Sequence, residues 1–218
     1  MSAPRPASGP PLRVVLDGQY TRLEPVGPEH VADLFDAART GDAESRFAYL
    51  FDTQPQSVTE MASYVDKAAA LDDPLMFAVI DKQTGKAEGR QTLMRITPEH
   101  GVIEIGNIYW GPRISRTRVT TEALYRHARY VFDELGYRRF EWKCNDRNAP
   151  SKAAALRFGF QFEGVFRQHM IVKGENRDTA WFAMLDGDWP QLRAEYERWL
   201  SPDNFEPDGT QKTRLRFD

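Results

Sequence analysis

The chain is poor in several features, and each shortage excludes a class of protein. Of its 218 residues only Cys144 is a cysteine, so no internal disulfide can form and a reducing compartment is expected. No apolar run approaches the roughly 18 residues that a membrane-spanning helix needs. The opening stretch MSAPRPASGPPL is rich in proline and lacks an apolar centre, which does not fit a signal peptide. We therefore expect a cytoplasmic protein with no membrane partner.

An excess of positive charge is missing as well. The 29 lysines and arginines and the 32 aspartates and glutamates leave a formal net charge of −3. A general nucleic-acid binder needs broad positive surface, so this class is not expected. The histidines, His30, His100, His127 and His169, are scattered without the spacing of metal ligands, and no metal site is expected. His127 falls in an arginine-rich helical segment and is expected at the surface.

A short basic loop stands between a strand-like run and a helix-like run. Residues 110–123, WGPRISRTRVTTEA, follow the apolar run Val102–Trp110 and lead into an amphipathic segment. The first turn of a helix leaves backbone N–H groups unpaired and carries partial positive charge. Arg113, Arg116 and Arg118 add charge at the same place. The sequence therefore predicts an anion site here.

The order of elements predicts a mixed sheet flanked by helices. Alternation and helical periodicity give the order βααβββαβαββα. Short turns within 75–110 favour an antiparallel meander, and the long helix after it favours a parallel right-handed crossover. Residues 1–18 and 201–218 are expected as tails of one domain, 19–200. The expected strands are 20–26, Leu75–Asp81, 87–96, Val102–Trp110, Arg139–Asn145, Gln161–Val172 and 176–185, and the expected helices are 28–38, 57–71, 119–135, 148–158 and 189–199.

Capping residues mark three helix ends. Ser57 and Glu60 have the spacing of a capping box. Asn148 is a favourable N-cap with Pro150 in the first turn. Gly136 stands where a C′ glycine ends the preceding helix.

Two motifs resemble the GNAT superfamily of acyl-CoA-dependent N-acetyltransferases. One is the strand, basic loop and helix with TEA at 121–123, and the other is the run NAPS…FGFQFEG within 148–164. The chain is most similar to the branch that acetylates the N-terminal amines of ribosomal proteins, over roughly residues 20–186. The resemblance implies an α/β fold with a mostly antiparallel sheet, a β-α-β crossover and splayed central strands. It also implies direct acetyl transfer from acetyl-CoA to a primary amine in a ternary complex.

The resemblance further implies which residues hold the acyl carrier. The strand before the loop pairs with the pantetheine arm, and the loop cradles the pyrophosphate. The short helix at 148–158 contacts the far side of the pantetheine or the thiol. The residues implied to bind acetyl-CoA are Ile108, Trp110, Arg113, Arg116, Thr117, Arg118, Val119, Thr120, Asn145, Asn148 and Ser151.

The loop departs from the family pattern. Two glycines, one residue apart, usually precede the helix, and here those positions fall on Arg116 and Arg118. Glycine permits positive φ, whereas arginine keeps its N–H at negative φ and adds a guanidinium. A tyrosine that many members use to reprotonate the thiolate falls on Ala155, which leaves Ser151 as the implied donor. A non-catalytic CoA-binding sensor on the same fold is therefore the alternative function.

Glu104 is the first candidate for a catalytic base or for a group that holds the substrate ammonium. It interrupts the apolar run VIEIGNIYW, where a carboxylate is costly unless it is paired or useful. Strand alternation places it on the same face as Gly106, Ile108 and Trp110. The alternative is that it pairs with an arginine.

Two neighbouring residues have weaker claims. Glu141 is the second candidate base and could instead pair with Lys143. Cys144 is expected as a buried apolar side chain rather than a nucleophile.

A backbone N–H near Tyr109 or Trp110 is the expected donor to the tetrahedral oxyanion. Asn145 could bridge the acyl carrier or cap the next turn.

The acceptor and the assembly stay open at this point. The acceptor is a protein N-terminus or a small-molecule amine, and the segment FAYLF at 47–51 predicts an apolar or aromatic wall for it. Both a monomer and a homodimer are compatible with the sequence. The weakest alternative is a nucleic-acid contact through the arginines around the loop, which are Arg113, Arg116, Arg118, Arg126 and Arg129.

Overall fold

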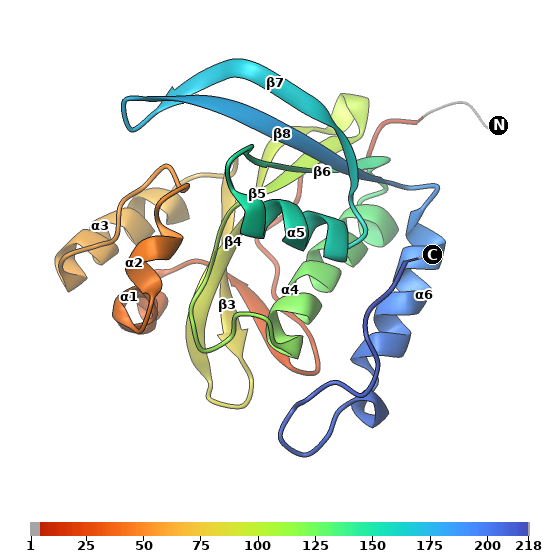
Figure 1. Ribbon diagram of the computed structural model, residues 1–218, viewed down its shortest axis with the longest axis horizontal. Helices are drawn as coiled ribbons and strands as arrows, with labels where there is room; N and C mark the ends of the chain where they lie inside the picture. The colour runs from red at the N-terminus through yellow and green to blue at the C-terminus, as the bar shows by residue number, and fades with distance from the viewer. Residues whose placement is uncertain (1–4, 218) are drawn as a thin grey trace.

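Eight strands form one sheet in the computed structural model, which describes residues 5–217 (Figure 1). They are β1 (Leu16–Asp17), β2 (Thr21–Pro25), β3 (Leu75–Asp81), β4 (Lys86–Thr97), β5 (Val102–Trp110), β6 (Arg139–Asn145), β7 (Gln161–Val172) and β8 (Glu175–Leu185). The order across the sheet is β1-β2-β3-β4-β5-β6-β8-β7. Only β5 and β6 are parallel neighbours, and the other pairs are antiparallel. The predicted meander and crossover are therefore confirmed.

Helices cover both faces of the sheet (Figure 1). They are α1 (Val31–Arg39), α2 (Ala43–Arg46), α3 (Val58–Ala69), α4 (Arg118–Arg129), α5 (Ala149–Arg157) and α6 (Trp189–Leu200). Alternation along β3 sends Met76, Ala78 and Ile80 into a core with α1 and α3, and Phe77 and Val79 into a larger core with α4 and α6. Helix α5 packs on β6 and β7, beside the predicted anion loop.

The predicted helix caps form with one change of partner. Ser57 Oγ accepts from the Glu60 N–H at 3.1 Å, but the Glu60 carboxylate accepts from the Gln56 N–H instead of from Ser57. Asn148 Oδ1 accepts from the Ser151 N–H at 3.1 Å. Gly136 has a φ of +69°, as a C′ glycine requires. Between α4 and Gly136 the chain makes one π-helical turn, Tyr130–Glu134.

The two terminal segments, expected as tails, lie partly against the domain. Leu16 and Asp17 pair with β2, and the Ala7 N–H donates to the Pro98 carbonyl at 2.9 Å. Phe205 and Leu215 are buried in the larger core. Both segments thus contribute apolar area that the composition of proline and charge did not predict. Residues 1–4 and 218 of the expected tails lie outside the described residues.

Strand β5 carries one extra residue. Opposite Gln91 of β4 stand two residues of β5, Asn107 and Ile108, and Asn107 has a φ of +47°. Such a β-bulge bends the strand and shifts the alternation of its side chains by one. Asn107 is held by its own side chain, whose amide donates to Tyr64 Oη at 2.9 Å.

β5 and β6 pair only over their first halves. The parallel ladder runs from Val102 opposite Arg139 to Ile105 opposite Trp142. Beyond it, residues 106–110 of β5 and residues 143–145 of β6 do not pair with each other. The implied splay is therefore present, and the bulge at the start of the separation gives its physical cause. No helix within 5–217 is long and apolar enough to span a membrane.

Candidate active site

The loop after β5 presents a row of free backbone donors. Thr117 caps α4, because its Oγ1 accepts from the Val119 N–H at 3.2 Å. Within residues 5–217 no acceptor takes the N–H groups of Arg116, Arg118 and Thr120. These donors stand at alternate positions at the positive end of a twelve-residue helix. The loop therefore offers free main-chain donors where the sequence predicts an anion site.

Arg116 adopts the backbone conformation that glycine would have. Its φ is +63°, in the left-handed region, so it offers its N–H without the negative φ that we gave as the condition for an arginine here. An arginine there keeps the turn at a conformational cost of about 1 kcal/mol. Its exposed guanidinium makes no hydrogen bond or ion pair within the described part of the chain. Arg116 thus combines the glycine-type turn with a charge that is free to move.

Arg113 points away from this row of donors. Its guanidinium binds Glu88 at 2.7 Å and Asp36 at 2.6 Å, and it also donates to Thr40 Oγ1 at 3.0 Å. The hydrogen bond to Glu88 is the main reason why the pKa of Arg113 is raised. Arg113 therefore connects the loop to α1 and β4, and its side chain does not face the predicted anion site.

The other loop arginines are also engaged. The Arg118 guanidinium lies 4.3 Å from the centre of the Tyr20 ring and 5.2 Å from that of Phe205. Arg126 pairs with Glu122 at 3.5 Å. Arg129 lies 3.9 Å from Asp133. These contacts remove most of the free positive surface that a nucleic-acid contact would use.

Of the remaining implied loop residues only Thr120 has a backbone N–H that is free within residues 5–217. Thr117 Oγ1 donates to the Ile114 carbonyl at 2.7 Å, and Thr120 Oγ1 donates to the Thr117 carbonyl at 3.1 Å. Val119 is buried in the core, and the N–H groups of Thr117 and Val119 are taken by the Ile114 carbonyl and by Thr117 Oγ1. Their side chains are thus engaged within the loop and the core.

Arg157 is a charge that the sequence did not reveal. It lies in the last turn of α5, and its Nη1 donates to Thr121 Oγ1 at 3.2 Å, in the first turn of α4. Burial lowers its pKa. It came to the anion site only because α5 packs beside α4, and the residues around it carry no local signal of this.

Trp110 fills the wedge between the separated strands. Its ring lies 6.4 Å from Trp142 and 5.8 Å edge-on from Phe158, and its Nε1 donates to Gln91 Oε1 at 3.2 Å. Ile108 packs against the same core. Both lie on the α4 side of the sheet, opposite Glu104. The expected common face with Glu104 is therefore wrong, because the bulge shifts the alternation.

Ser151 lies beneath this wedge. Trp142 Nε1 donates to Ser151 Oγ at 3.0 Å. The neighbouring Cys144 is buried, as expected, and burial raises its pKa while a hydrogen bond with Ser151 partly opposes this. The Ser151 hydroxyl is thus held by an indole donor, which leaves its own proton to be donated.

The two implied asparagines serve the turn between β6 and α5. Asn145 Oδ1 accepts from the Arg147 N–H at 2.9 Å, which is the capping alternative left open above. Asn148 is the N-cap of α5. Their amide N–H₂ groups take no acceptor within residues 5–217. The side-chain amides of Asn145 and Asn148 are therefore available as hydrogen-bond donors to a ligand at the end of β6.

Glu104 is buried and paired. It is 3% exposed, and Oε2 lies 2.6 Å from Arg95 Nη1 and 2.8 Å from Lys143 Nζ. Lys143 is shared with Glu141 at 2.6 Å. Glu141 therefore pairs with Lys143, as the alternative interpretation of Glu141 predicted. Glu104 pairs with an arginine, which is the alternative interpretation given for Glu104 above. Arg95 is the exposed member of the set, with 42% of its side chain accessible.

The segment 47–51 forms a wall on the Glu104 side of the sheet. Phe47 is buried and stacks on Tyr109 with ring centres 4.8 Å apart. Phe51 is 52% exposed. The tip of the β7–β8 hairpin, which arches over this region in Figure 1, is tied to it by Lys173, whose Nζ donates to the Phe47 carbonyl at 2.8 Å. An aromatic wall is present, as the segment predicted.

His127 is fully buried, so the expectation of a surface histidine is wrong. Gln91 Nε2 lies 2.9 Å from His127 Nδ1, and the ring meets Phe77 edge-on with centres 4.7 Å apart. Burial lowers its pKa to about 3. The arginines of α4 had suggested a polar surface, but position 127 falls on the apolar face beside Leu124 and Ala128.

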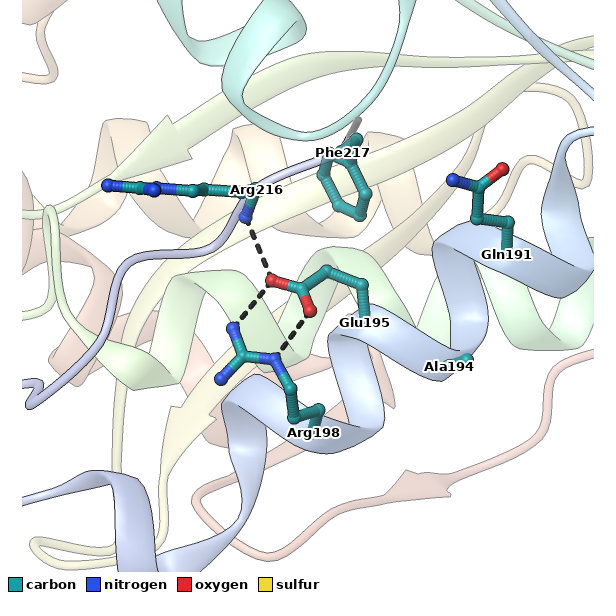
Figure 2. Close-up of a pocket in the computed structure, with 6 residues that line it drawn as sticks. All are labelled: Gln191, Ala194, Glu195, Arg198, Arg216 and Phe217. Carbon is teal, nitrogen blue, oxygen red and sulfur yellow. Dashed lines mark hydrogen bonds and ion pairs between the residues drawn. The ribbon is translucent and has the colours of Figure 1, made fainter.

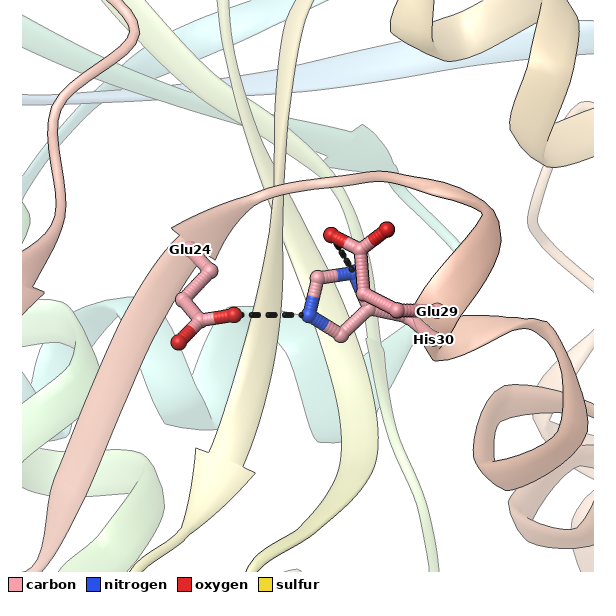
Figure 3. Close-up of side chains that lie close together, drawn as sticks. All are labelled: Glu24, Glu29 and His30. Atoms are coloured by element: carbon pink, nitrogen blue, oxygen red, sulfur yellow. Dashed lines mark hydrogen bonds and ion pairs between the residues drawn. The ribbon is translucent and has the colours of Figure 1, made fainter.

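One group of side chains has the grouping of a metal site. The ligand atoms of Glu24, Glu29 and His30 lie within 4.8 Å of one another (Figure 3). Both imidazole nitrogens are already engaged, since Nδ1 accepts from the Gly27 N–H at 3.1 Å and Nε2 lies 3.0 Å from Glu24. These contacts cap the turn that precedes α1, which is a sufficient structural role for the group.

A surface pocket lies elsewhere, between α6 and the C-terminal segment (Figure 2). Glu195 closes it by binding Arg198 at 2.6 Å and the Arg216 N–H at 2.9 Å. Its lining contains no residue of the loop or the wedge. The lining residues are Gln191, Ala194, Glu195, Arg198, Arg216 and Phe217.

The fold and this site define a class of protein. A mixed sheet whose parallel central strands separate at the N-terminus of a helix is the arrangement of GNAT-type acetyltransferases. The sequence profile of the Acetyltransferase (GNAT) domain matches residues 21–161, and the chain belongs to this family.

Individual relatives support the same assignment. A GCN5-related N-acetyltransferase structure from Brucella melitensis is 55% identical, with a TM-score of 0.94 over 97% of this chain and 96% of that one. A structure described as a probable GNAT-family acetyltransferase from Chromobacterium violaceum is 38% identical, with a TM-score of 0.79 over 87% and 94%. The uncharacterized N-acetyltransferase p20 of Bacillus licheniformis is 30% identical over 113 residues, which are 50% of this chain and 61% of p20. The chain thus spans about three fifths of that curated relative.

Proposed function

We propose that the protein is an N-acetyltransferase that moves the acetyl group of acetyl-CoA directly to a primary amine. The observation that carries this is the row of free N–H groups of Arg116, Arg118 and Thr120 at the open end of β5 and β6. A row of main-chain donors at a helix N-terminus suits a pyrophosphate. The edge of β5 that β6 leaves unpaired suits an extended chain bearing amide groups.

The side chains around the loop would complete the carrier site. Arg116 lies within the donor row and Arg157 reaches Thr121 in the first turn of α4, so both add positive charge that suits the phosphates. Trp110 forms the floor of the wedge. The free amide donors of Asn145 and Asn148 suit the carbonyl groups of the pantetheine arm.

In the proposed reaction the amine nitrogen attacks the thioester carbonyl from the Glu104 side of the sheet. A C–N bond forms, the C–S bond breaks, and the ammonium proton leaves while the thiolate gains one. Glu104 is the proposed group that holds the ammonium or takes its proton. Ser151 is the proposed hydrogen-bond donor that stabilises the leaving thiolate, and the proton lost by the amine balances the one that the thiolate takes up from solvent. An α-amine with a pKa near 8 is already about one tenth neutral at pH 7, so positioning contributes more than the base.

A thiol-release assay with acetyl-CoA against peptides and small amines tests the proposal. Release that depends on an amine, with the acetylated amine recovered by mass spectrometry, supports it. Calorimetric binding of acetyl-CoA without release for any amine would instead favour a CoA-binding sensor. Ala155, where many relatives place a tyrosine, motivates that second outcome.

A further inference from the structure

Arg177 of β8 is a buried cation without a partner. It is 6% exposed, and its guanidinium makes no hydrogen bond or ion pair with any of residues 5–217. The guanidinium lies over the Phe51 ring, whose centre is 5.2 Å from its Cζ. Burying an unpaired charge is expensive, and burial lowers the pKa of Arg177 accordingly. Within residues 5–217 the Phe51 contact and the attraction of Glu104 offset part of this cost, and Arg177 Nε stays buried without a hydrogen-bond partner.

The neighbouring charges are balanced without Arg177. Glu104 and Glu141 are satisfied by Arg95, Lys143 and Arg139, and Arg139 also holds an exposed glutamate of β7, at 2.5 Å. This network contains equal numbers of both charges, with the cations Arg95, Lys143 and Arg139 and the anions Glu104, Glu141 and Glu163.

The acid next to Arg177 in sequence is also engaged elsewhere. Asp178 accepts from the Gln168 N–H at 2.7 Å and from Asn176 Nδ2 at 2.9 Å. Of the groups that act electrostatically on Arg177, Cys144 and Glu104 favour its charged form and Arg95 opposes it. Arg177 thus remains as one uncompensated positive charge.

Arg177 is placed to meet the acceptor. The β6–β8 ladder ends at Asn145 opposite Thr179, so Arg177 lies two residues beyond, on the Thr179 face. That is the open end of the wedge, on the same side of the sheet as Glu104. Phe51, an exposed residue of the aromatic wall, lies against the guanidinium.

We propose that Arg177 binds a carboxylate carried by the amine acceptor, so that the substrate class is amines bearing a carboxylate. This rests on the proposed function and narrows it. The planar fork of arginine matches a carboxylate bidentately, and pairing would repay the cost of its burial. Two sources share this chemistry, a free α-amino acid and a peptide whose N-terminal region is acidic.

Paired acceptors test the proposal without any mutation. Each free L-amino acid is compared with its primary amide, and a peptide beginning Ser-Asp with one beginning Ser-Asn. We expect kcat/KM for the acid of one pair to exceed that for the amide by about tenfold or more. The amide has the less basic amine, so intrinsic reactivity favours the opposite order. A preference within the amino acid pairs would identify a free α-amino acid as the acceptor. A preference within the peptide pair would identify a peptide with an acidic N-terminal region.

Substitution of Arg177 should remove the preference. In Arg177→Gln we expect the acid and the amide to become equal within about threefold, while the activity on the amide is kept. Arg177→Lys should fall between the two, because it keeps the charge and loses the fork. Arg167→Gln, on the exposed part of β7, is the matched control and should leave the preference intact.

Thermal stability separates a binding role from a structural one. Removal of an unpaired buried charge should leave the Tm of Arg177→Gln unchanged or higher without ligand. A lower Tm together with an unchanged acid preference would overturn the proposal. So would equal use of acids and amides by the unmodified protein, even if acetyl transfer itself is observed.

The same pairs of acid and amide also test the Arg177 site if the protein shows no acetyl transfer. Calorimetric titration of acid and amide into the protein saturated with CoA measures the preference as binding alone. Binding of acids over amides would support the Arg177 site while the proposed transfer fails. Equal or absent binding of both would overturn the Arg177 site.

Discussion

Trp142 Nε1 donates a hydrogen bond to Ser151 Oγ across 3.0 Å, linking the last residue of β6 that pairs with β5 to the first turn of α5. An indole N–H can only donate, so it occupies one of the two lone pairs of the serine oxygen. The contact therefore restricts the orientation of the Ser151 hydroxyl and positions its O–H to donate a hydrogen bond.

We expect Ser151→Ala to lower kcat about 10- to 100-fold and to leave acetyl-CoA affinity nearly unchanged, because the thiolate loses its hydrogen-bond donor. Stopped-flow thiol release and calorimetry measure the two quantities. Trp142→Phe, which keeps the ring and loses the orienting donor, should have a smaller effect of the same kind. A kcat unchanged in Ser151→Ala would leave Ser151 with a structural role only.

Arg116→Glu should weaken acetyl-CoA binding on the order of tenfold to a hundredfold, since it replaces a free cation by an anion beside the donor row. Arg116→Gly should bind much better than the glutamate variant, because it keeps the N–H and the left-handed turn. Arg167→Glu, with the same charge change on β7, is the control. Equal affinities for all of these variants would contradict the position of the anion site.

Glu104→Gln should lower turnover at neutral pH and recover part of it at higher pH, where the amine deprotonates by itself. The expected loss is about tenfold at pH 7. A pH profile of kcat/KM for the variant and the parent makes the comparison. Glu141→Gln serves as a matched change in the same ion-pair network. Profiles that coincide at every pH would make Glu104 a structural residue.

His127 should make the protein less stable in acid. Its pKa is about 3 in the folded state and about 6.5 when unfolded, so only the unfolded state takes up this proton between those values. Stability from this group is complete above pH 6.5 and falls by about 1.4 kcal/mol per pH unit below it. Urea unfolding at pH 7.5, 6 and 5 should show a shallower loss for His127→Asn. Identical slopes for parent and variant would disprove the assignment.

The sequence predicted the fold well because its signals were local and repeated. Turns, caps and alternation placed the meander, the crossover and the helix starts at Ser57 and Asn148. The basic loop was located because strand, loop and helix are contiguous. The errors came from single residues that break a pattern, above all Asn107, whose positive φ shifts the faces of β5.

Side-chain pairing was harder to predict, since it depends on contacts between distant elements. Arg113 binds Glu88 and Asp36, which come from β4 and α1. Arg157 reaches α4 only through helix packing. Arg177 carries no local sequence signal of its burial or of its unpartnered Nε.

The bulge at Asn107 decides which face of the sheet receives each aromatic ring at the end of β5. If Asn107 were a regular strand residue instead of an extra one, alternation would run on unbroken and exchange the sides of Tyr109 and Trp110. An indole would then enter the aromatic wall, and a phenol would enter the core beneath the wedge. The single extra residue thus sets the ring chemistry of both faces.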